Sequence, residues 1–328
     1  QRGERCRCFF ADAPGMNAPA PESARHASQQ AEWVRRPERS NWTMLRLMSW
    51  ISLRLGRAPA RLVLAGISLY FLLFAPAAKA ASRAYLRRTL DREPGFADLF
   101  RHFHSFASTI HDRIFLLNAR FDLFQVEVHG EDIIQEVLAA GRGAFLMGVH
   151  MGSFEVVRAI GRRQPGLRVA MVMYEENARK LNAALAAINP AAAPEIIPLG
   201  QLDSMLRVQA SLDEGMVLGM LGDRTLGGDP TLRVPFLGAD AEFPLGPMRL
   251  AAMLRRPVLF MSGLYLGGNR YVIHFERLAD FSDVERTGRD AAIQSAVTTY
   301  VAGLERHCRA APYNWFNFFD FWHPKDAG

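Results

Sequence analysis

A histidine and a glutamate five positions apart are the residues whose types and spacing best support chemistry in this chain. His150 follows an apolar run, and Glu155 lies beyond a short Met-Gly turn. A neutral imidazole can accept a proton from a hydroxyl, and a carboxylate bonded to its other nitrogen fixes the tautomer and stabilises the imidazolium. The pair therefore predicts general-base catalysis. The same spacing also fits a structural histidine capped by a nearby acid.

A strand, a turn and a helix must position this pair. Residues 144–149 are uncharged and follow a glycine, which favours a buried strand. Ser153 suits a helix N-cap, and Glu155 then falls in the first helical turn, where a carboxylate suits the helix dipole. With His150 at the strand end and Glu155 in the helix, the turn can bring the two side chains together.

A second stretch with polar chemistry follows the apolar run 216–221. Asp223 and Arg224 would lie at the carboxyl end of a strand, where open α/β sheets place ligand sites. Arg224 could hold a phosphate or carboxylate with two parallel hydrogen bonds. An Asp–Arg pair that only closes the loop is the alternative.

Strand patterns alternate with helix patterns through the middle of the chain, which predicts an α/β fold with a mostly parallel sheet flanked by helices. The expected strands are 124–129, 144–149, 168–174, 195–199, 216–221, 258–266 and 271–275. The expected helices are 96–118, 132–140, 178–188, 202–213, 245–254 and 290–308, with another starting at Phe154.

The amino-terminal third divides into two parts before a catalytic domain at 91–328. Residues 1–40 have the composition of a disordered tail, and residues 41–90 are expected to form membrane-associated helices, the first of them an amphipathic helix at 42–55. Within them, the uncharged run 62–78 lies between arginine-rich flanks and reaches the lower edge of the roughly 17–25 residues that span a bilayer. Pro76 should interrupt this helix near its end. We expect an inserted or interfacial membrane anchor, with a buried core helix as the alternative.

No metal site or cofactor is expected. His102, His104 and His111 lie in one predicted helix, but their spacing does not put good ligands on one face, so solvated or capped histidines are expected. The cysteines Cys6, Cys8 and Cys308 form neither a zinc pattern nor a disulfide framework.

The charge balance points to an acidic partner. The net charge is +6 and the sequence pI is about 9.5, which suits a membrane surface, a phosphorylated substrate or an acidic carrier protein. Nucleic acid is not expected, because no nucleic-acid-binding motif accompanies the charge. The aromatic stretch 313–322 predicts core packing, an acyl-chain pocket or a membrane-interface rim.

Taken together, these blocks resemble the bacterial lipid A biosynthesis acyltransferase family (the lauroyl/myristoyl type), within the lysophospholipid acyltransferase superfamily. The likeness covers roughly residues 42–324. It rests on HMGSFE, on GDR followed by VPFLG and AEFPLGP, on the hydrophobic amino-terminal anchor and on WFNFFDFW.

The resemblance implies transfer of a fatty-acyl group from a thioester on acyl carrier protein, or on CoA, to a hydroxyl or amine of a lipid-like acceptor. His150 would be the base and Glu155 its orienting partner. Asp223 and Arg224 would bind substrate, and amides near Gly152 and Ser153 would stabilise the oxyanion. Phe236 and Gly238 would shape the adjoining wall. The family also implies the cytoplasmic face of a bacterial inner membrane.

The chain departs from the Asp-His-Asp-like motif of lipid A enzymes, because it reads Asp223-Arg224-Thr225. This difference favours another envelope lipid, or a polyene-type product, as acceptor. A thioester or lipid hydrolase with the same pair, and a non-catalytic membrane scaffold on the same fold, are the alternatives.

Overall fold

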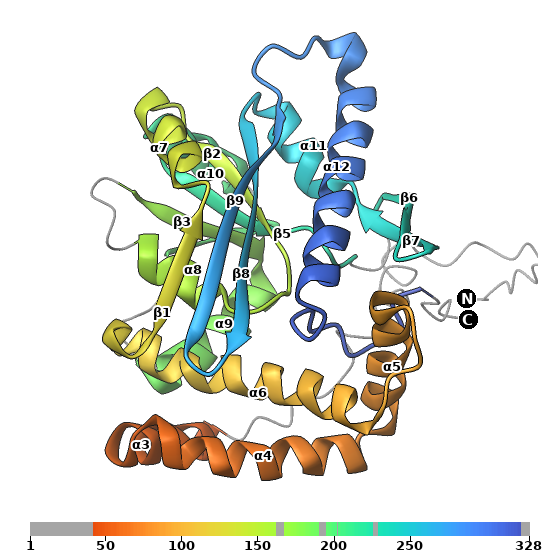
Figure 1. The fold of residues 1–328 in the computed structure, drawn as a ribbon. Helices are drawn as coiled ribbons and strands as arrows, with labels where there is room; N and C mark the ends of the chain where they lie inside the picture. The colour runs from red at the N-terminus through yellow and green to blue at the C-terminus, as the bar shows by residue number, and fades with distance from the viewer. Residues whose placement is uncertain (1–41, 162–166, 190–194, 202, 226–228, 323–328) are drawn as a thin grey trace, which may run out of the picture.

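The computed structural model describes residues 42–161, 167–189, 195–201, 203–225 and 229–322 (Figure 1). The predicted tail at 1–40 lies outside the described residues.

The centre of the fold is a sheet of seven strands, and its mostly parallel character is confirmed. Its order is β1-β9-β8-β2-β5-β3-β4. From β8 to β4 neighbouring strands run parallel, whereas β8 and β9 form an antiparallel pair and β1 follows β9 in parallel. The strands are β1 (Gln125–His129), β2 (Ala144–Gly148), β3 (Val169–Tyr174), β4 (Glu195–Leu199), β5 (Val217–Leu221), β8 (Pro257–Gly267) and β9 (Arg270–Asp280).

Helices cover both faces of the sheet, which explains why β2 is uniformly apolar. Phe145 and Met147 pack into the core beneath α10, α11 and α12, while Ala144 and Leu146 pack toward α7 and α8. A strand buried on both faces has no solvent-facing position that would favour a polar side chain. These helices are α7 (Glu131–Ala140), α8 (Phe154–Gly161), α9 (Glu175–Ile188), α10 (Ser204–Asp213), α11 (Gly246–Met253) and α12 (Arg289–Ala310).

A two-stranded hairpin lies beside the sheet, and the sequence patterns did not predict it. Strands β6 (Thr231–Phe236) and β7 (Ala239–Pro244) pair antiparallel. Leu237 and Gly238 join them, with φ values of 50° and 78°. Positive φ at both central residues is the geometry that two-residue hairpin loops prefer. A leucine in the first position, in place of Asn or Asp, hides the turn from sequence inspection.

In the part of the chain that the structure describes, four helices precede the sheet and lie beside it (Figure 1). They are α3 (Trp42–Leu55), α4 (Arg57–Phe74), α5 (Pro76–Leu90) and α6 (Phe96–Leu117). The predicted interruption at Pro76 is confirmed, because α4 ends there and α5 begins with the proline. By length and composition α4 could cross a membrane.

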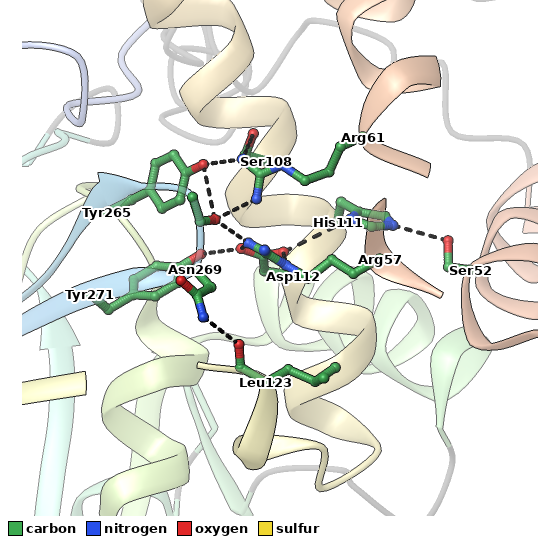
Figure 2. A network of polar contacts seen from close by, with 11 residues as sticks. Ser52, Arg57, Arg61, Ser108, His111, Asp112, Leu123, Tyr265, Asn269 and Tyr271 are labelled. Carbon is green, nitrogen blue, oxygen red and sulfur yellow. Dashed lines mark hydrogen bonds and ion pairs between the residues drawn. The ribbon is translucent and has the colours of Figure 1, made fainter. Parts of the chain in front are cut away.

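Polar contacts fasten α4 to α6 and to the β8–β9 turn (Figure 2). Arg57 forms two hydrogen bonds of 2.7 Å with the fully buried carboxylate of Asp112. The hydroxyl of Tyr271 donates to the same carboxylate at 2.8 Å. Arg61 and Arg57 also donate to the carbonyl of Gly268. The inner face of α4 is therefore tied to α6 by a buried charge pair, which is costly to separate, and Tyr271 joins the same carboxylate from β9.

Two histidines of α6 are buried hydrogen-bonding groups, which is the capped form of the solvated or capped side chains that the sequence led us to expect. His102 is fully buried between the hydroxyl of Ser82 and the carbonyl of Trp315, at 2.8 Å each. His111 is 3% exposed and lies 3.0 Å from the hydroxyl of Ser52. Burial lowers the pKa of His102 and of His111 to about 4, so both rings are neutral near pH 7.

Candidate active site

The carboxyl ends of β2 and β5 bring His150 and Asp223 together. The strands pair in parallel with Gly148 opposite Leu221, and each functional residue follows two positions later. The N–H of Gly222 donates to the carbonyl of Gly148 at 3.2 Å, which continues the alignment beyond the strands. Residues far apart in sequence thus become neighbours through register alone.

Asp223 holds His150 through two hydrogen bonds. Nδ1 of His150 lies 2.7 Å from Oδ1, and the backbone N–H of His150 donates to Oδ2 at 3.0 Å. An ionised carboxylate only accepts, so this partner assigns the ring proton to Nδ1 and the lone pair to Nε2. Nε2 has no hydrogen-bond partner among the described residues, and 28% of the side chain is exposed. A substrate can therefore reach the basic nitrogen.

Two further donors surround the carboxylate of Asp223, which is fully buried. The indole Nε1 of Trp315 donates to Oδ2 at 2.9 Å, and Nδ2 of Asn317 lies 3.4 Å from the same oxygen. Burial alone would raise the pKa of Asp223, but His150 and Arg224 together hold it well below its usual range. Asp223 is thus an anion at physiological pH.

The electrostatic surroundings keep His150 neutral. Burial is the largest cause of its lowered pKa, the positive charge of Arg224 adds to the effect, and Asp223 opposes it. A histidine whose pKa is lowered is mostly unprotonated near pH 7. It is therefore available as a base in the resting protein.

Arg224 is a fixed cation beside this pair. Its Nε donates to Oδ1 of Asn317 at 2.7 Å, and its Nη2 donates to the carbonyl of Phe316 at 3.1 Å. The guanidinium carbon lies 5.7 Å from the ring centroid of Phe319. Burial lowers the pKa of Arg224 to about 10, so the group stays charged at neutral pH. The expected aspartate–arginine neighbourhood at a strand end is present, with the arginine oriented by the carboxyl-terminal segment.

Glu155 does not occupy Nδ1 of His150, where the sequence reasoning placed it. Its Oε1 lies 2.7 Å from Nε of Arg113 on α6, and Glu155 is 6% exposed. The hydroxyl of Ser153 lies 3.4 Å from Oε2. Because α8 packs against α6, the first turn of α8 lies beside the positive charge of Arg113. The carboxylate that orients His150 is that of Asp223 in the loop after β5, and a catalytic role for Glu155 stays a prediction.

The amides of Gly152 and Ser153 are already used, so the expected oxyanion donors are not available in this geometry. The N–H of Gly152 donates to the carbonyl of Asn314 at 3.0 Å, and that of Ser153 donates to Gly263 at 2.7 Å. Gly152 has φ 59°, and a Cβ there would lie 1.9 Å from the carbonyl oxygen of Gly263. Only glycine fits, which fixes the turn after His150 against β8.

Phe236 is the last residue of β6, and Gly238 lies two positions later in the hairpin turn. Phe236 is fully buried, and its ring centroid lies 5.3 Å from that of Trp315. Gly238 lies in the exposed turn, and no described contact links it to His150. Their proposed roles as substrate wall stay predictions.

Sequence reasoning missed Trp315, Asn317 and Arg113. The first two lie in the stretch 313–322, whose aromatic content predicts core packing, an acyl-chain pocket or a membrane-interface rim. The useful signal was polar: two asparagines and an indole N–H within a buried run must find hydrogen-bond partners. Trp315 and Asn317 find theirs at Asp223. Asn314 instead bonds the backbone of Tyr265.

A buried carboxylate that orients a partly accessible histidine at the carboxyl edge of an α/β sheet suits general-base catalysis. The family model described as bacterial lipid A biosynthesis acyltransferase matches residues 111–323, a range that contains every residue of this site. The chain belongs to that family and is an acyltransferase. A search of curated proteins finds no match.

Proposed function

We propose that the chain transfers a fatty-acyl group from an acyl carrier protein thioester to a hydroxyl or amine of a lipid-like acceptor, at the inner membrane on its cytoplasmic face. The observation that carries this proposal is the 2.7 Å contact between His150 Nδ1 and Asp223, which directs the lone pair of Nε2 outward. CoA thioesters have the same reacting atoms and are the alternative donor.

The reaction follows from this geometry. Nε2 of His150 takes the proton of the acceptor hydroxyl while the acceptor oxygen bonds to the thioester carbonyl carbon. Asp223 stabilises the imidazolium that forms. The tetrahedral intermediate then collapses, the carbon–sulfur bond breaks, and the thiolate leaves with the proton that Nε2 had accepted. An ester and a free thiol result, and His150 is again neutral.

Arg224 supports this proposal because its positive charge lies close enough to act on His150 and Asp223, and it can therefore stabilise negative charge that develops beside them. Its orientation is fixed by Asn317 and Phe316, so little reorganisation accompanies the reaction. A fixed guanidinium also suits an anionic group on donor or acceptor. These interactions take over the role that sequence reasoning had given to the amides of Gly152 and Ser153, which still line the turn beside His150.

We further propose that α3 and α4 lie on the membrane surface without crossing the bilayer. The inner face of α4 buries Ala60, Leu64, Ser68 and Leu72, and Arg57 is paired with Asp112 beneath it. The outer face is apolar and exposed. Its exposed residues are Leu62, Val63, Leu69, Tyr70, Phe71, Leu73 and Phe74.

The neighbours of α4 argue against a spanning orientation. If α4 crossed the bilayer in this packing, α6 with its buried Asp98 and Asp112 would enter the hydrocarbon region, where charged groups are costly. A helix with one apolar face and one docked face instead suits the interface plane. The active site would then face a lipid acceptor that stays in its membrane.

The test of the reaction is a transfer assay on purified protein with a radiolabelled acyl group on acyl carrier protein and an extract of bacterial envelope lipids. We expect labelled lipid with the wild-type protein, and a rate about 10²–10⁴-fold lower for His150→Ala, the usual cost of removing a general base. Mass spectrometry of the labelled product identifies the acceptor.

Two outcomes would overturn the proposal. Labelled free fatty acid in place of labelled lipid would mean that water is the acceptor and that the protein is a hydrolase. A folded His150→Ala variant with near-normal transfer would remove His150 from the mechanism. Circular dichroism and thermal melting serve as the folding controls for each variant.

A further inference from the structure

The segment that follows α12 runs beside the catalytic turn and is tied to it by backbone hydrogen bonds. The N–H of Phe316 donates to the carbonyl of His150 at 2.9 Å, and Met151 and Trp315 form an antiparallel bridge. The side chain of Asn314 bonds both backbone groups of Tyr265 on β8, at 2.7 and 3.0 Å. The chain at 314–317 is thus built into the active site, although it comes from the far end of the fold.

Trp315 is held in a single position by its surroundings. It is fully buried, and its ring packs against Tyr85, Phe236 and Phe321, with centroid distances of 5.0, 5.3 and 4.8 Å. His102 binds its carbonyl oxygen. The indole N–H is the one polar atom of this side chain, and it points at Oδ2 of Asp223. A locked aromatic ring presents that donor without further loss of conformational entropy.

Asn317 connects the two charged residues of the site. It is 1% exposed. Its Oδ1 accepts the hydrogen bond from Nε of Arg224, which requires the amide nitrogen to face the other way, toward Asp223. At 3.4 Å the contact between Nδ2 and Asp223 is long, so Trp315 is the stronger of the two donors to that carboxylate.

We propose that Trp315 and Asn317 are positioning residues for acyl transfer, which hold Asp223 and Arg224 in place and thereby set the proton affinity of His150. This inference rests on the proposed function of His150 and Asp223. It assigns to a stretch of aromatic sequence a role in catalysis that core packing alone would not give it.

The direction of the effect follows from hydrogen-bond chemistry. Each N–H that donates to Asp223 withdraws charge from the carboxylate, so less negative charge faces the ring of His150. When the indole donor is removed, Asp223 binds the Nδ1 proton more tightly and stabilises the imidazolium more. His150 should therefore become protonated at a higher pH. The acid side of the pH–rate profile moves in the same direction, because the base must be neutral to act.

Trp315→Phe removes the indole donor while keeping an aromatic ring in the core. Because Asp223 is then held less firmly against His150, we expect kcat to fall about 10–100-fold, by analogy with the loss of outer-shell partners at metal sites, with KM nearly unchanged. The acid limb of kcat/KM should move to higher pH. Asn317→Leu keeps the volume but removes the contacts with Asp223 and Arg224. We expect the pH profile to shift in the same direction, and the charged guanidinium of Arg224 to be held less firmly in place.

Trp322→Phe is the matched control. Its ring also packs in the aromatic cluster, and its indole N–H donates to the carbonyl of Phe236 at 3.2 Å and not to Asp223. If Trp315 only packed the core, Trp315→Phe and Trp322→Phe would have the same effect on the pH profile. We therefore expect Trp322→Phe to change thermal stability without moving the pH profile.

The titration of His150 provides a readout that needs no acyl transfer. Its ring nitrogens are identified in nitrogen-15 NMR spectra of the full-length protein as the signals missing from His150→Ala. The expected result is a higher midpoint for His150 in Trp315→Phe, with the wild-type midpoint in Trp322→Phe. A wild-type midpoint and wild-type pH profile in a folded Trp315→Phe protein would overturn the proposal.

This design separates the two hypotheses. If Trp315→Phe fails to fold, Asn317→Leu carries the same test of midpoint and profile, and wild-type values there would also overturn the role of the segment. If His150→Ala retains normal transfer, the proposed function fails, whereas the NMR midpoints still report whether Trp315 acts on His150 through Asp223.

Discussion

Two carboxylates are candidates for orienting His150, and the structure favours the one that is more distant in sequence. Glu155 is near in sequence, but Arg113 engages it. Asp223 is 73 positions away and lies 2.7 Å from the ring. Two carboxylates with different partners should have separable effects on catalysis, because only one of them is in contact with the base.

Asp223→Asn should be the more damaging substitution for catalysis. It removes the charge that stabilises imidazolium, and its amide can donate to Nδ1 and so favour the wrong tautomer, an error that costs about 10⁴-fold in a serine protease. Glu155→Gln should leave kcat within about tenfold but lower the melting temperature, because Arg113 loses the partner of a mostly buried ion pair. Initial transfer rates and thermal melts of both variants measure the contrast.

A different ranking would reassign the orienting acid. If Glu155→Gln loses as much kcat as Asp223→Asn while both proteins keep their fold, then Glu155 acts in the reaction and the ground-state contact with Asp223 is not the catalytic one. Arg113→Met checks the structural part, since it should reproduce the loss of stability.

The elements of the fold show which parts of this arrangement a sequence can reveal. The predicted helix at 42–55 coincides with α3, and β4 also has its predicted bounds. Period and composition suffice there because each signal is local. The β6–β7 hairpin was missed, since its turn lacks the usual Asn-Gly or Asp-Gly pair.

The candidate site could be predicted only in part from the sequence, because local signals place residues on strands but do not give the order of the strands. His150 and Asp223 could each be placed at a strand end, but their contact depends on β2 and β5 being neighbours in the sheet, and strand order is not local information. The contact between Trp315 and Asp223 joins residues 92 positions apart and depends on the path of the chain after α12. The division at 90/91 also stays a prediction, and the pairs Arg57–Asp112 and Ser82–His102 bridge it.

The outer face of α4 carries a prediction of its own. Leu62, Leu69 and Leu73 are 80%, 39% and 54% exposed, so replacing all three with Glu should leave the core intact. Each lost apolar contact with lipid is worth roughly 1–3 kcal/mol, so the triple variant should bind at least about a hundredfold less tightly to vesicles of phosphatidylethanolamine and phosphatidylglycerol. Flotation on a density gradient measures the bound fraction.

Leu206→Glu is the matched control, because Leu206 is 71% exposed on α10, outside the proposed membrane face. Unchanged flotation of the triple variant would contradict a lipid-facing α4, and a dimer that dissociates on substitution would instead assign this face to a second copy of the chain.

The orientation of α4 is tested by cysteines at Arg54 and Ala77, with Cys6 and Cys8 changed to Ser. In sealed membrane vesicles, an impermeant maleimide should label both positions from the same side. Labelling from opposite sides would mean that the helix spans the bilayer.

At the scale of the whole molecule, charge links the fold to its donor. The chain carries a net charge of +6, and the proposed donor is an acidic carrier protein. Attraction between opposite net charges speeds diffusional encounter, and salt weakens it as the screening length falls from about 30 Å at 0.01 M to about 8 Å at 0.15 M. The donor should therefore be recognised partly at long range, before the thioester reaches His150.

With acyl carrier protein as donor, kcat/KM should fall on the order of tenfold between these two salt concentrations, while kcat changes little, because steering acts on encounter and not on chemistry. A small neutral thioester with the same acyl chain should show almost no salt dependence. Detergent and acceptor lipid are held constant, so changes in membrane binding affect both donors alike. If salt lowers kcat/KM equally for the two donors, charge is acting on the protein or its acceptor, and the case for an acidic carrier protein loses its electrostatic support. If only the carrier-bound donor responds, the net positive charge of this chain is part of how it selects its substrate.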